Sequence, residues 1–466
     1  MSFPGQAHHP HPPLAGLPPN AHLLPATPYL PPGLQLVQAH WYCRHGERAP
    51  VRQRLVGVGE IPAVFSLCSV GREFRSAVLS LSGSGASPSS SSPHQTKAMD
   101  VRRWTEDVGD SARGFKGGPA DCYWGELTDL GRRSALSLGA ILRDIYVPLG
   151  FLPATFSAST VDLVAFRSTN MPRTIETLHQ LVEGLWPHST RDDGVKVDFQ
   201  LRGWQDEDLI PGQSCRKLRA LDLASIAAAA KAHNPSLARL DPVLVPIVGG
   251  PLRIDSAPRA SGVLDTALVC KAHDIKLPPE LGDPRTLSEL EAAVVHEWFD
   301  GYSNLEFRRL AMGRLLGSLR ETLDAKRRDP LEQHEKTRLH IYSCHDTSLA
   351  GILNALDAFD RRWPPFTSHI SVELLRASAP PPSAPSLLSR LLPSALSSTP
   401  SPSPSAPHYV RLRYNARPVY LPACAPEGKH LPGAPEVCTF EAFSEAVKGV
   451  ELSQAEWRER CGGKGE

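Results

Sequence analysis

The sequence carries almost no net charge, because its 50 Lys and Arg residues nearly cancel its 49 Asp and Glu residues. Proteins that bind nucleic acid or other polyanions usually show a net basic footprint, so this balance argues against that class. The sequence also contains no run of 18 or more apolar residues, which is the minimum for a transmembrane helix. We therefore expect no nucleic-acid partner and no integral membrane segment.

Positive charge is also missing from residues 1–43, where no Lys or Arg precedes Arg44. A secretory signal begins with a basic region and a mitochondrial transit peptide carries scattered Arg, so we predict neither. The nine Cys residues are an odd number, are widely spread and form no CxxC pair. This pattern favours reduced thiols in the cytosol, with a bridge between Cys424 and Cys438 as the alternative.

Proline is abundant, with 45 residues, and it is concentrated in low-complexity segments. Residues 1–33 contain His-Pro and Pro-Pro repeats and are predicted to form a disordered, Pro-rich arm. Residues 83–93 form a Ser-rich insertion, and residues 377–407 form a longer insertion of Ser, Pro and Ala. The second lies between segments at 369–376 and 409–415 in which apolar and polar residues alternate. We predict neighbouring strands with a lengthened connection, since closing a longer loop costs little.

The remaining sequence alternates between strand-like and helix-like segments. Strands are predicted at 34–39, 161–166 and 339–343, and helices at 127–146, 175–186, 289–323 and 349–356. Thr128 is the candidate N-cap of the first helix, and the 289–323 segment should be two helices separated around Gly301. This alternation predicts an α/β fold in which helices cover the faces of a central sheet.

Residues 190–290 interrupt this alternation with an Ala-rich helix and Pro-rich loops. We predict that they form an inserted, mainly helical cap. The cap divides the α/β core into a first part at 34–189 and a second part at 291–450. Residues 451–466 are predicted to be a C-terminal tail. With 41% apolar residues, the chain has enough material for one large core beside this cap.

Reactive residues come directly after three of the predicted strands. These segments read RHGERAP at 44–50, RST at 167–169 and HDT at 345–347. Ligands of open α/β sheets bind outside the carboxyl ends of the strands, so we expect the three segments to meet at one site. Arg guanidinium groups match phosphate oxygens, and a neutral imidazole can attack phosphorus. Phosphoryl transfer depends mainly on positioning and charge stabilisation, and this combination predicts it.

RHGxRxP followed by a distant HD resembles the signature of the histidine acid phosphatases, the second branch of the histidine phosphatase superfamily. WGELTDLGRRSALSLGAILRDIY resembles the family's GELTxxG helix entry, and RSTNMPRT resembles its RSTxxxR segment. The resemblance covers roughly residues 34–450 without the two insertions. It implies a phosphoglycerate-mutase-like core of three layers, in which a central, mostly parallel sheet is flanked by helices. DEDLIPGQSC at 206–215 and FDRRWPPFTSHISVELL at 359–375 are most similar to the lysophosphatidic acid phosphatase subgroup.

The resemblance implies a role for each matching residue. His45 would be the nucleophile that forms a phosphohistidine, and Asp346 would be the proton donor and the later base. Gly46 would leave room for that attack. The phosphate-binding residues that it implies are Arg44, Arg48, Arg167 and His345. No metal ion or other cofactor is implied. The role of Arg173 stays open, because Pro172 precedes it where many members carry acidic residues.

The leading prediction is an acid phosphatase that hydrolyses small phosphate monoesters, with a lysophospholipid phosphate as a candidate substrate. An inositol polyphosphate phosphatase of the phytase kind would need a strongly basic pocket, whereas residues 190–290 carry both signs of charge and apolar segments. A mutase of the first superfamily branch lacks the pairing of RHGxRxP with HD. A catalytically inactive scaffold that binds through Pro-rich segments would usually have lost the nucleophile or an Arg, and all of these are present.

Three other groups of residues are expected to be structural. The acidic residues at 206–208 should form a solvated cluster, with a place at the rim of the pocket as the alternative, and the His273-Asp274 pair in the cap should be structural. Most of the tryptophans should lie in the core rather than against substrate, namely Trp104, Trp124, Trp186, Trp204, Trp298 and Trp363.

A phosphate monoester has a second pKa of about 6, so mild acid gives a monoanion and keeps a carboxylic donor protonated. We therefore expect a pH optimum below neutrality. The expected location is cytoplasmic. A mitochondrial location is the alternative, because the lysophosphatidic subgroup has mitochondrial members. The oligomeric state is not indicated.

Overall fold

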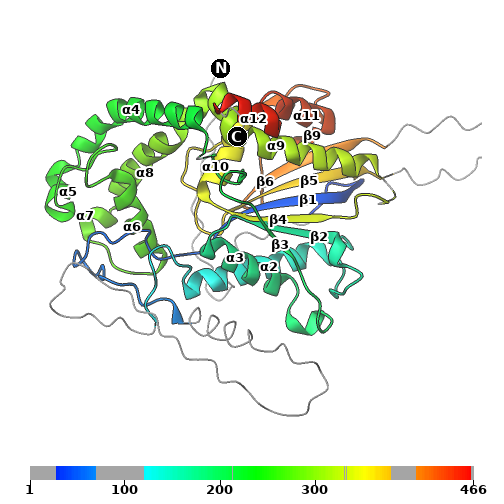
Figure 1. The fold of residues 1–466 in the computed structure, drawn as a ribbon, viewed down its shortest axis with the longest axis horizontal. Coiled ribbons are helices and arrows are strands. Elements are labelled where there is room, and N and C mark those ends of the chain that lie inside the picture. The colour runs from blue at the N-terminus through cyan, green and yellow to red at the C-terminus, as the bar shows by residue number, and fades with distance from the viewer. Residues whose placement is uncertain are drawn as a thin grey trace, which may run out of the picture.

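A single mixed β-sheet forms the centre of the protein (Figure 1). The structure is a computed structural model that describes residues 28–69, 120–212, 214–329, 331, 333–378 and 406–462. Within these residues the sheet has nine strands in the order β3-β2-β4-β1-β5-β6-β9-β8, and β7 pairs with β6. The strands are β1 (Leu34–Arg44), β2 (Val164–Ser168), β3 (Phe199–Leu201), β4 (Leu339–Cys344), β5 (His369–Ala377), β6 (His408–Tyr414), β7 (Arg417–Pro418), β8 (His430–Leu431) and β9 (Ala434–Thr439).

The strands that lead to the predicted site are parallel. β1 pairs with β4, and β2 pairs with both β4 and β3, in parallel register. β5 is antiparallel to β1 and β6 is antiparallel to β5, so β6 again runs in the direction of β1. The pairing of β5 with β6 confirms that the segments at 369–376 and 409–415 are neighbouring strands. Their Ser/Pro-rich connection lies mostly outside the described residues, as does the whole insertion at 83–93.

Helices cover both faces of this sheet, and a separate group of helices lies beyond the ends of its strands (Figure 1). The α-helices of the described residues are α2 (Asp129–Tyr146), α3 (Pro172–Leu185), α4 (Arg216–Ala238), α5 (Asp241–Val248), α6 (Ala260–Ala272), α7 (Pro279–Gly282), α8 (Pro284–Phe299), α9 (Leu305–Arg328), α10 (Asp346–Ala355), α11 (Phe440–Lys448) and α12 (Gln454–Arg460). The Thr128 side chain accepts a hydrogen bond from the Gly131 N–H and caps α2, as predicted. A short 3-10 segment around Gly301 separates α8 from α9, which was also predicted.

The central strand β1 is buried on both faces, because successive side chains of a strand point to opposite sides. Trp41 packs into one core cluster with Leu138 of α2. Its neighbour Tyr42 packs on the opposite face of the sheet, in a second core cluster with Leu316 of α9 and Leu353 of α10. The sheet therefore lies between two helical layers, which confirms the predicted α/β core.

The helices α4 to α8 lie beside the end of the sheet where β1 finishes (Figure 1). They fall within or just after the range 190–290 that the sequence predicts to be a cap. One part of that range belongs to the core instead, because β3 pairs with β2 through Phe199, Gln200 and Leu201. The first cap helix begins only at Arg216.

The residues predicted to form a C-terminal tail are packed against the core as far as residue 462. Trp457 of α12 is buried, and its indole N–H donates to the Leu310 carbonyl oxygen at 2.8 Å. The Arg314 guanidinium lies 3.9 Å from the centre of the Trp457 ring. The prediction of a tail is therefore wrong for residues 451–462.

The Pro-rich arm predicted for residues 1–33 lies mostly outside the described residues. Its last part, from residue 28, contacts the sheet. The Tyr29 hydroxyl donates a hydrogen bond to Glu373 of β5, and the Tyr29 carbonyl oxygen accepts one from Arg411 of β6 at 2.8 Å. The prediction of a disordered arm is thus wrong at Tyr29, which packs against β5 and β6.

Six of the nine cysteines form disulfides, which pair Cys68 with Cys122, Cys215 with Cys461 and Cys424 with Cys438. The expectation of reduced thiols is wrong for these six, whereas the alternative of a bridge between Cys424 and Cys438 is confirmed. The Cys215–Cys461 bond joins the start of α4 to the end of α12 across 246 residues. In the chain-entropy account such a long closed loop restricts the unfolded chain more than a short one.

Candidate active site

Five of the six predicted site residues line one cavity of about 760 Å³ at the carboxyl ends of β1 and β4. They are Arg44, His45, Arg48, His345 and Asp346. The pairing of the strands explains this convergence, since the last residue of β1, Arg44, lies opposite the last residue of β4, Cys344. The chain leaves both strands at the same edge of the sheet, so the RHG and HDT segments emerge side by side.

The ring of His45 keeps its nitrogen Nε2 unprotonated. Its Nδ1 lies 2.9 Å from the Gly46 carbonyl oxygen. A carbonyl oxygen only accepts hydrogen bonds, so Nδ1 carries the proton and Nε2 keeps its lone pair. Burial, together with the cations of Arg44 and Arg173, holds the pKa of His45 well below its ordinary value. The imidazole is therefore neutral at mildly acidic pH.

Gly46 and Gly131 let the loop that carries His45 contact the start of α2. A Cβ atom on Gly46 would lie 2.4 Å from the Gly131 carbonyl oxygen, and one on Gly131 would lie 2.1 Å from the Glu47 carbonyl oxygen. Both contacts are with backbone, which cannot move aside as a flexible side chain could. The absence of a side chain on Gly46 thus serves this backbone packing, and the predicted clearance for the attack is secondary.

The two arginines of RHGER extend over the ring of Phe366. The Arg44 guanidinium lies 4.2 Å from the ring centre, donates to the Pro364 carbonyl oxygen at 2.5 Å and pairs with Asp346 at 2.7 Å. The Arg48 guanidinium lies 5.6 Å from the same ring centre and pairs with Asp265 of α6 at 2.8 Å. These contacts fix two buried cations beside His45, where an anionic phosphate would bind.

His345 and Asp346 stand at the N-terminus of α10. The Nε2 atom of His345 lies 2.9 Å from the Thr169 hydroxyl, and burial and the Arg173 cation lower the pKa of His345 to about 3. Burial raises the pKa of the Asp346 carboxyl, but the cations of Arg44 and Arg48 outweigh it, and the net pKa is lowered. The free protein therefore holds Asp346 as a carboxylate beside a neutral His345.

Arg173, whose role the sequence left open, also lines the cavity. It occupies the first turn of α3, directly after Pro172 at the first position of that helix, where proline is well tolerated. Burial and the cation of Arg48 lower the pKa of Arg173 to about 10. Arg173 thus lies close to other cations, and a bound anion would reduce the electrostatic repulsion between them.

Arg167 has a different place. It is absent from the cavity lining, and its Nη2 atom lies 2.6 Å from both a Glu207 oxygen and an Asp208 oxygen. The phosphate contact predicted for Arg167 does not fit this position. The expectation of a solvated acidic cluster is wrong for Glu207 and Asp208, which are 3% and 4% exposed, and holds for Asp206 alone.

We expect Arg173→Ala to lower kcat/KM about 10²- to 10³-fold while leaving the melting temperature nearly unchanged, because it removes one phosphate donor. Arg167→Ala should instead lower the stability by about 3–5 kcal/mol, because it removes the cation that pairs with the buried Glu207 carboxylate, whereas Asp208 keeps its ion pair with Arg202. Steady-state kinetics and thermal melts of both variants check this, with Arg173→Lys as the charge-conserving control. A stable Arg167→Ala protein that has lost its activity would restore the phosphate role of Arg167.

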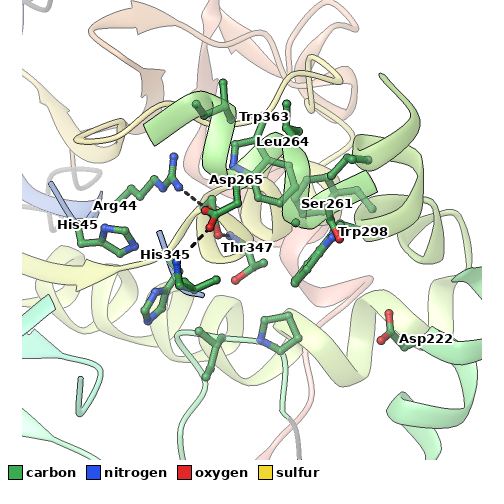
Figure 2. A pocket seen from close by; sticks show the side chains of 18 of the residues that line it. Arg44, His45, Asp222, Ser261, Leu264, Asp265, Trp298, His345, Thr347 and Trp363 are labelled. Atoms are coloured by element: carbon green, nitrogen blue, oxygen red, sulfur yellow. Dashed lines mark hydrogen bonds and ion pairs between the residues drawn. The ribbon is translucent and has the colours of Figure 1, made fainter. Parts of the chain in front are cut away.

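The cap supplies the outer wall of the cavity, which has mixed character. Figure 2 shows Arg44, His45 and His345 at one end, Asp222 at the other, and Leu264, Ser261 and Trp298 between them. Apolar lining residues include Ile210, Leu218, Leu264, Leu268, Val294 and Phe299. Trp204 and Trp298 are 52% and 44% exposed and line the cavity, so the prediction that tryptophans belong to the core is wrong for these two.

Two other features of the cap bear on the sequence predictions. Asp265, which nothing in the sequence singled out, accepts hydrogen bonds from both Arg48 and the Val51 N–H. His273 bonds the Thr128 hydroxyl and the Val269 carbonyl oxygen, each at 2.9 Å, and supports the structure as predicted. No helix of the described residues is both long and apolar enough to cross a membrane.

Comparisons with known proteins and protein families show which sequences this chain resembles. A family profile described as the histidine phosphatase superfamily (branch 2) matches residues 35–238 and 295–415. A probable acid phosphatase of Schizosaccharomyces pombe is 34% identical over 467 residues, which cover 94% of this chain and 96% of that protein. Lysophosphatidic acid phosphatase type 6 of Homo sapiens is 28% identical over 268 residues, which cover 56% of this chain and 58% of that protein.

Solved structures share the fold at lower identity. A Hafnia alvei phytase in complex with tartrate has a TM-score of 0.55 and 15% identity, over 92% of this chain and 100% of that chain. A Bifidobacterium longum multiple inositol polyphosphate phosphatase in complex with phosphate has a TM-score of 0.53 and 12% identity, over 94% and 98%. Together with the family profile and the near full-length relative, these findings show that the chain belongs to branch 2 of the histidine phosphatase superfamily.

Proposed function

We propose that the protein is an acid phosphatase that hydrolyses phosphate monoesters through a phosphohistidine on His45. The observation that carries this proposal is the neutral His45 ring, which shares one cavity with the cations of Arg44, Arg48 and Arg173. Nε2 attacks phosphorus while the bond to the leaving oxygen breaks, and that oxygen takes a proton. Water then attacks the phosphohistidine, a base takes its proton, and inorganic phosphate leaves with His45 restored.

Asp346 is the group placed to handle these protons, but it begins as a carboxylate. The sequence argument assumed a protonated donor in mild acid, and the lowered pKa of Asp346 contradicts that for the free protein. A substrate monoanion can bring the missing proton with it. Binding also draws Arg44 toward the phosphate and adds negative charge beside Asp346, and both effects raise the pKa of that carboxyl. We propose that Asp346 accepts the substrate's proton and passes it to the leaving oxygen.

The pH dependence should therefore follow the substrate rather than the protein. In the free protein the pKa of His345 is about 3 and those of His45 and Asp346 lie below their ordinary values, so none of the three changes charge as the pH rises through neutrality. We expect kcat/KM to fall above pH ~6, where the phosphate monoanion loses its proton. Ethyl phosphate and trifluoroethyl phosphate test this, because the fluorinated ester has the lower second pKa. The decrease of kcat/KM should therefore occur at a lower pH for the fluorinated ester. The same decrease for both esters would show that a group of the protein titrates instead.

For the substrate class, we propose a phosphate ester with an apolar group, such as a lysophospholipid phosphate. The apolar residues that α6 and α8 place along the cavity, including Leu264, Leu268 and Val294, support this choice. Four relatives, the human protein among them, are named lysophosphatidic acid phosphatase type 6, which agrees with it. An inositol polyphosphate is the second candidate, because Arg52, Arg54 and Arg219 add positive charge to the lining.

Phosphate release in EDTA at pH 5.5 separates these possibilities. The panel contains p-nitrophenyl phosphate, lysophosphatidic acid and inositol hexakisphosphate. We expect turnover that survives chelation, with the highest kcat/KM on lysophosphatidic acid. Leu268→Glu tests the apolar wall, because Leu268 lines the cavity and is only partly buried, and it should raise KM for that substrate while leaving p-nitrophenyl phosphate nearly unaffected. Preference for inositol hexakisphosphate would favour the second candidate, and no release from any of the three by the folded protein would contradict the proposed activity.

We also propose that the chain acquires its disulfides in an oxidising compartment, in place of the cytoplasmic or mitochondrial location expected from the sequence. The three bonded pairs support this proposal, and the remaining thiols are Cys43, Cys270 and Cys344, all buried. Alkylation of protein isolated from its native source, in denaturant without reductant, should label these three cysteines only. Mass spectrometry reads the count, and labelling of all nine would support a reducing compartment.

A further inference from the structure

Two histidines and an aspartate lie together on the cap, away from the cavity that holds His45. His233 belongs to α4, His296 to α8, and Asp300 to the 3-10 segment that follows α8. One potential ligand atom from each lies within 4.8 Å of the other two. None of the three lines the catalytic cavity.

The local geometry of the helices creates this cluster. His296 and Asp300 are four residues apart at the end of α8, so they share one face, and the His296 Nδ1 lies 2.9 Å from both Asp300 oxygens. The ring of His233 stacks on that of His296, with 4.0 Å between the ring centres. All three side chains are partly exposed, which gives an ion access to them.

This donor set suits a first-row transition metal. Two imidazoles and one carboxylate supply three ligands to many zinc sites, and water completes the tetrahedron. The charged group that faces the cluster is Arg361, whose Nη1 lies 3.8 Å from an Asp300 oxygen and whose side chain is 69% exposed. It is free to swing into solvent when a cation arrives.

We propose that His233, His296 and Asp300 form a metal site that takes Zn²⁺ or a similar divalent transition ion. The stacked rings must turn about their side-chain bonds for their lone pairs to converge, and the partial exposure of the cluster allows this. Asp300 serves either as the third ligand or as the acceptor that orients the His296 ring toward the ion.

Such an ion would join two walls of the catalytic cavity. α4 supplies Leu218 and Asp222 to the lining, and α8 supplies Val294 and Trp298. An ion held between His233 and His296 fixes the spacing of these helices. It would stabilise the cap and influence substrate binding without taking part in phosphoryl transfer. The effect on substrate rests on the proposed function, whereas binding and stability do not.

The test is zinc binding by the full chain after treatment with EDTA and dialysis. Calorimetric titration with ZnCl₂ should show a site that is lost in both His233→Gln and His296→Gln. Zinc at a hundredfold excess over its Kd should raise the melting temperature by about 2–3 °C in the wild type, because the ion binds the folded state. Gln preserves much of the size and polarity of His, so the variants should fold, and circular dichroism with a melt in EDTA checks that.

A matched control is needed because the sequence also contains His8, His9 and His11, which can bind zinc without any folded site. His188→Gln removes an exposed imidazole outside the cluster and should behave as the wild type does. The same zinc uptake and the same rise in melting temperature for wild type and for His233→Gln would overturn the proposal. If zinc binds as expected and no phosphatase activity is found, the metal site stands and the proposed function fails.

Discussion

Replacement of His45 by Ala should reduce phosphatase turnover at least about 10⁴-fold, as expected when a covalent nucleophile is removed. The other imidazole of the cavity, that of His345, cannot replace the nucleophile, because His345 caps α10 and its Nε2 atom is hydrogen-bonded to the Thr169 hydroxyl. The fold should survive, because within the described residues the His45 ring hydrogen-bonds to the carbonyl oxygen of its own neighbour, Gly46, and not to a distant segment. Unchanged circular dichroism with lost turnover would assign the defect to chemistry.

Trapping of the intermediate makes this prediction more specific. Rapid acid-free denaturation of the wild type during turnover of ³²P-labelled substrate should leave label on the peptide that contains His45. The His45→Ala protein should carry none. His345→Ala is the matched control, because it removes a second imidazole from the same cavity and should still form the labelled intermediate. Label on a different residue in the wild type would contradict the assignment of His45.

Replacement of Asp346 by Asn should slow alkyl phosphates about 10²- to 10⁴-fold, the usual contribution of a general acid. It should slow formation of the intermediate from p-nitrophenyl phosphate much less, because nitrophenolate leaves without a proton. The size of Asn matches that of Asp, so α10 should keep its position. The variant loses the 2.7 Å ion pair with Arg44, which leaves that cation free to bind phosphate.

The second half of the reaction supplies an independent readout. Asp346 is also the base proposed to activate water, so Asp346→Asn should accumulate phosphohistidine and show a burst of nitrophenolate before a slow steady state. Pre-steady-state absorbance measures the burst directly. Equal losses on alkyl and nitrophenyl substrates, without a burst, would move Asp346 to the role of positioning Arg44.

The sequence alone was sufficient to predict the reactive segments and the α/β core that carries them. RHGERAP and HDT each follow a short apolar run, and a strand that is buried on both faces needs such a run. Parallel strands then bring their carboxyl ends to one edge, which explains why Arg44 and His345 meet although 300 residues separate them. The helix cap at Thr128 and the helix break at Gly301 could also be predicted, because caps and breaks depend on residues that are close in the sequence.

The tertiary structure alone decided which arginines line the cavity and what the cap contributes. Arg167 and Arg173 are only six positions apart in the sequence. Arg167 forms ion pairs with Glu207 and Asp208 outside the cavity lining. Arg173 belongs to the first turn of α3 and lines the cavity. In the sequence those carboxylates resemble a solvated cluster, because their pairing with Arg167 joins residues about 40 positions apart. The disulfide between Cys215 and Cys461 and the pairing of Arg48 with Asp265 are equally non-local. Each depends on how distant segments pack, a property that no local pattern of residues records.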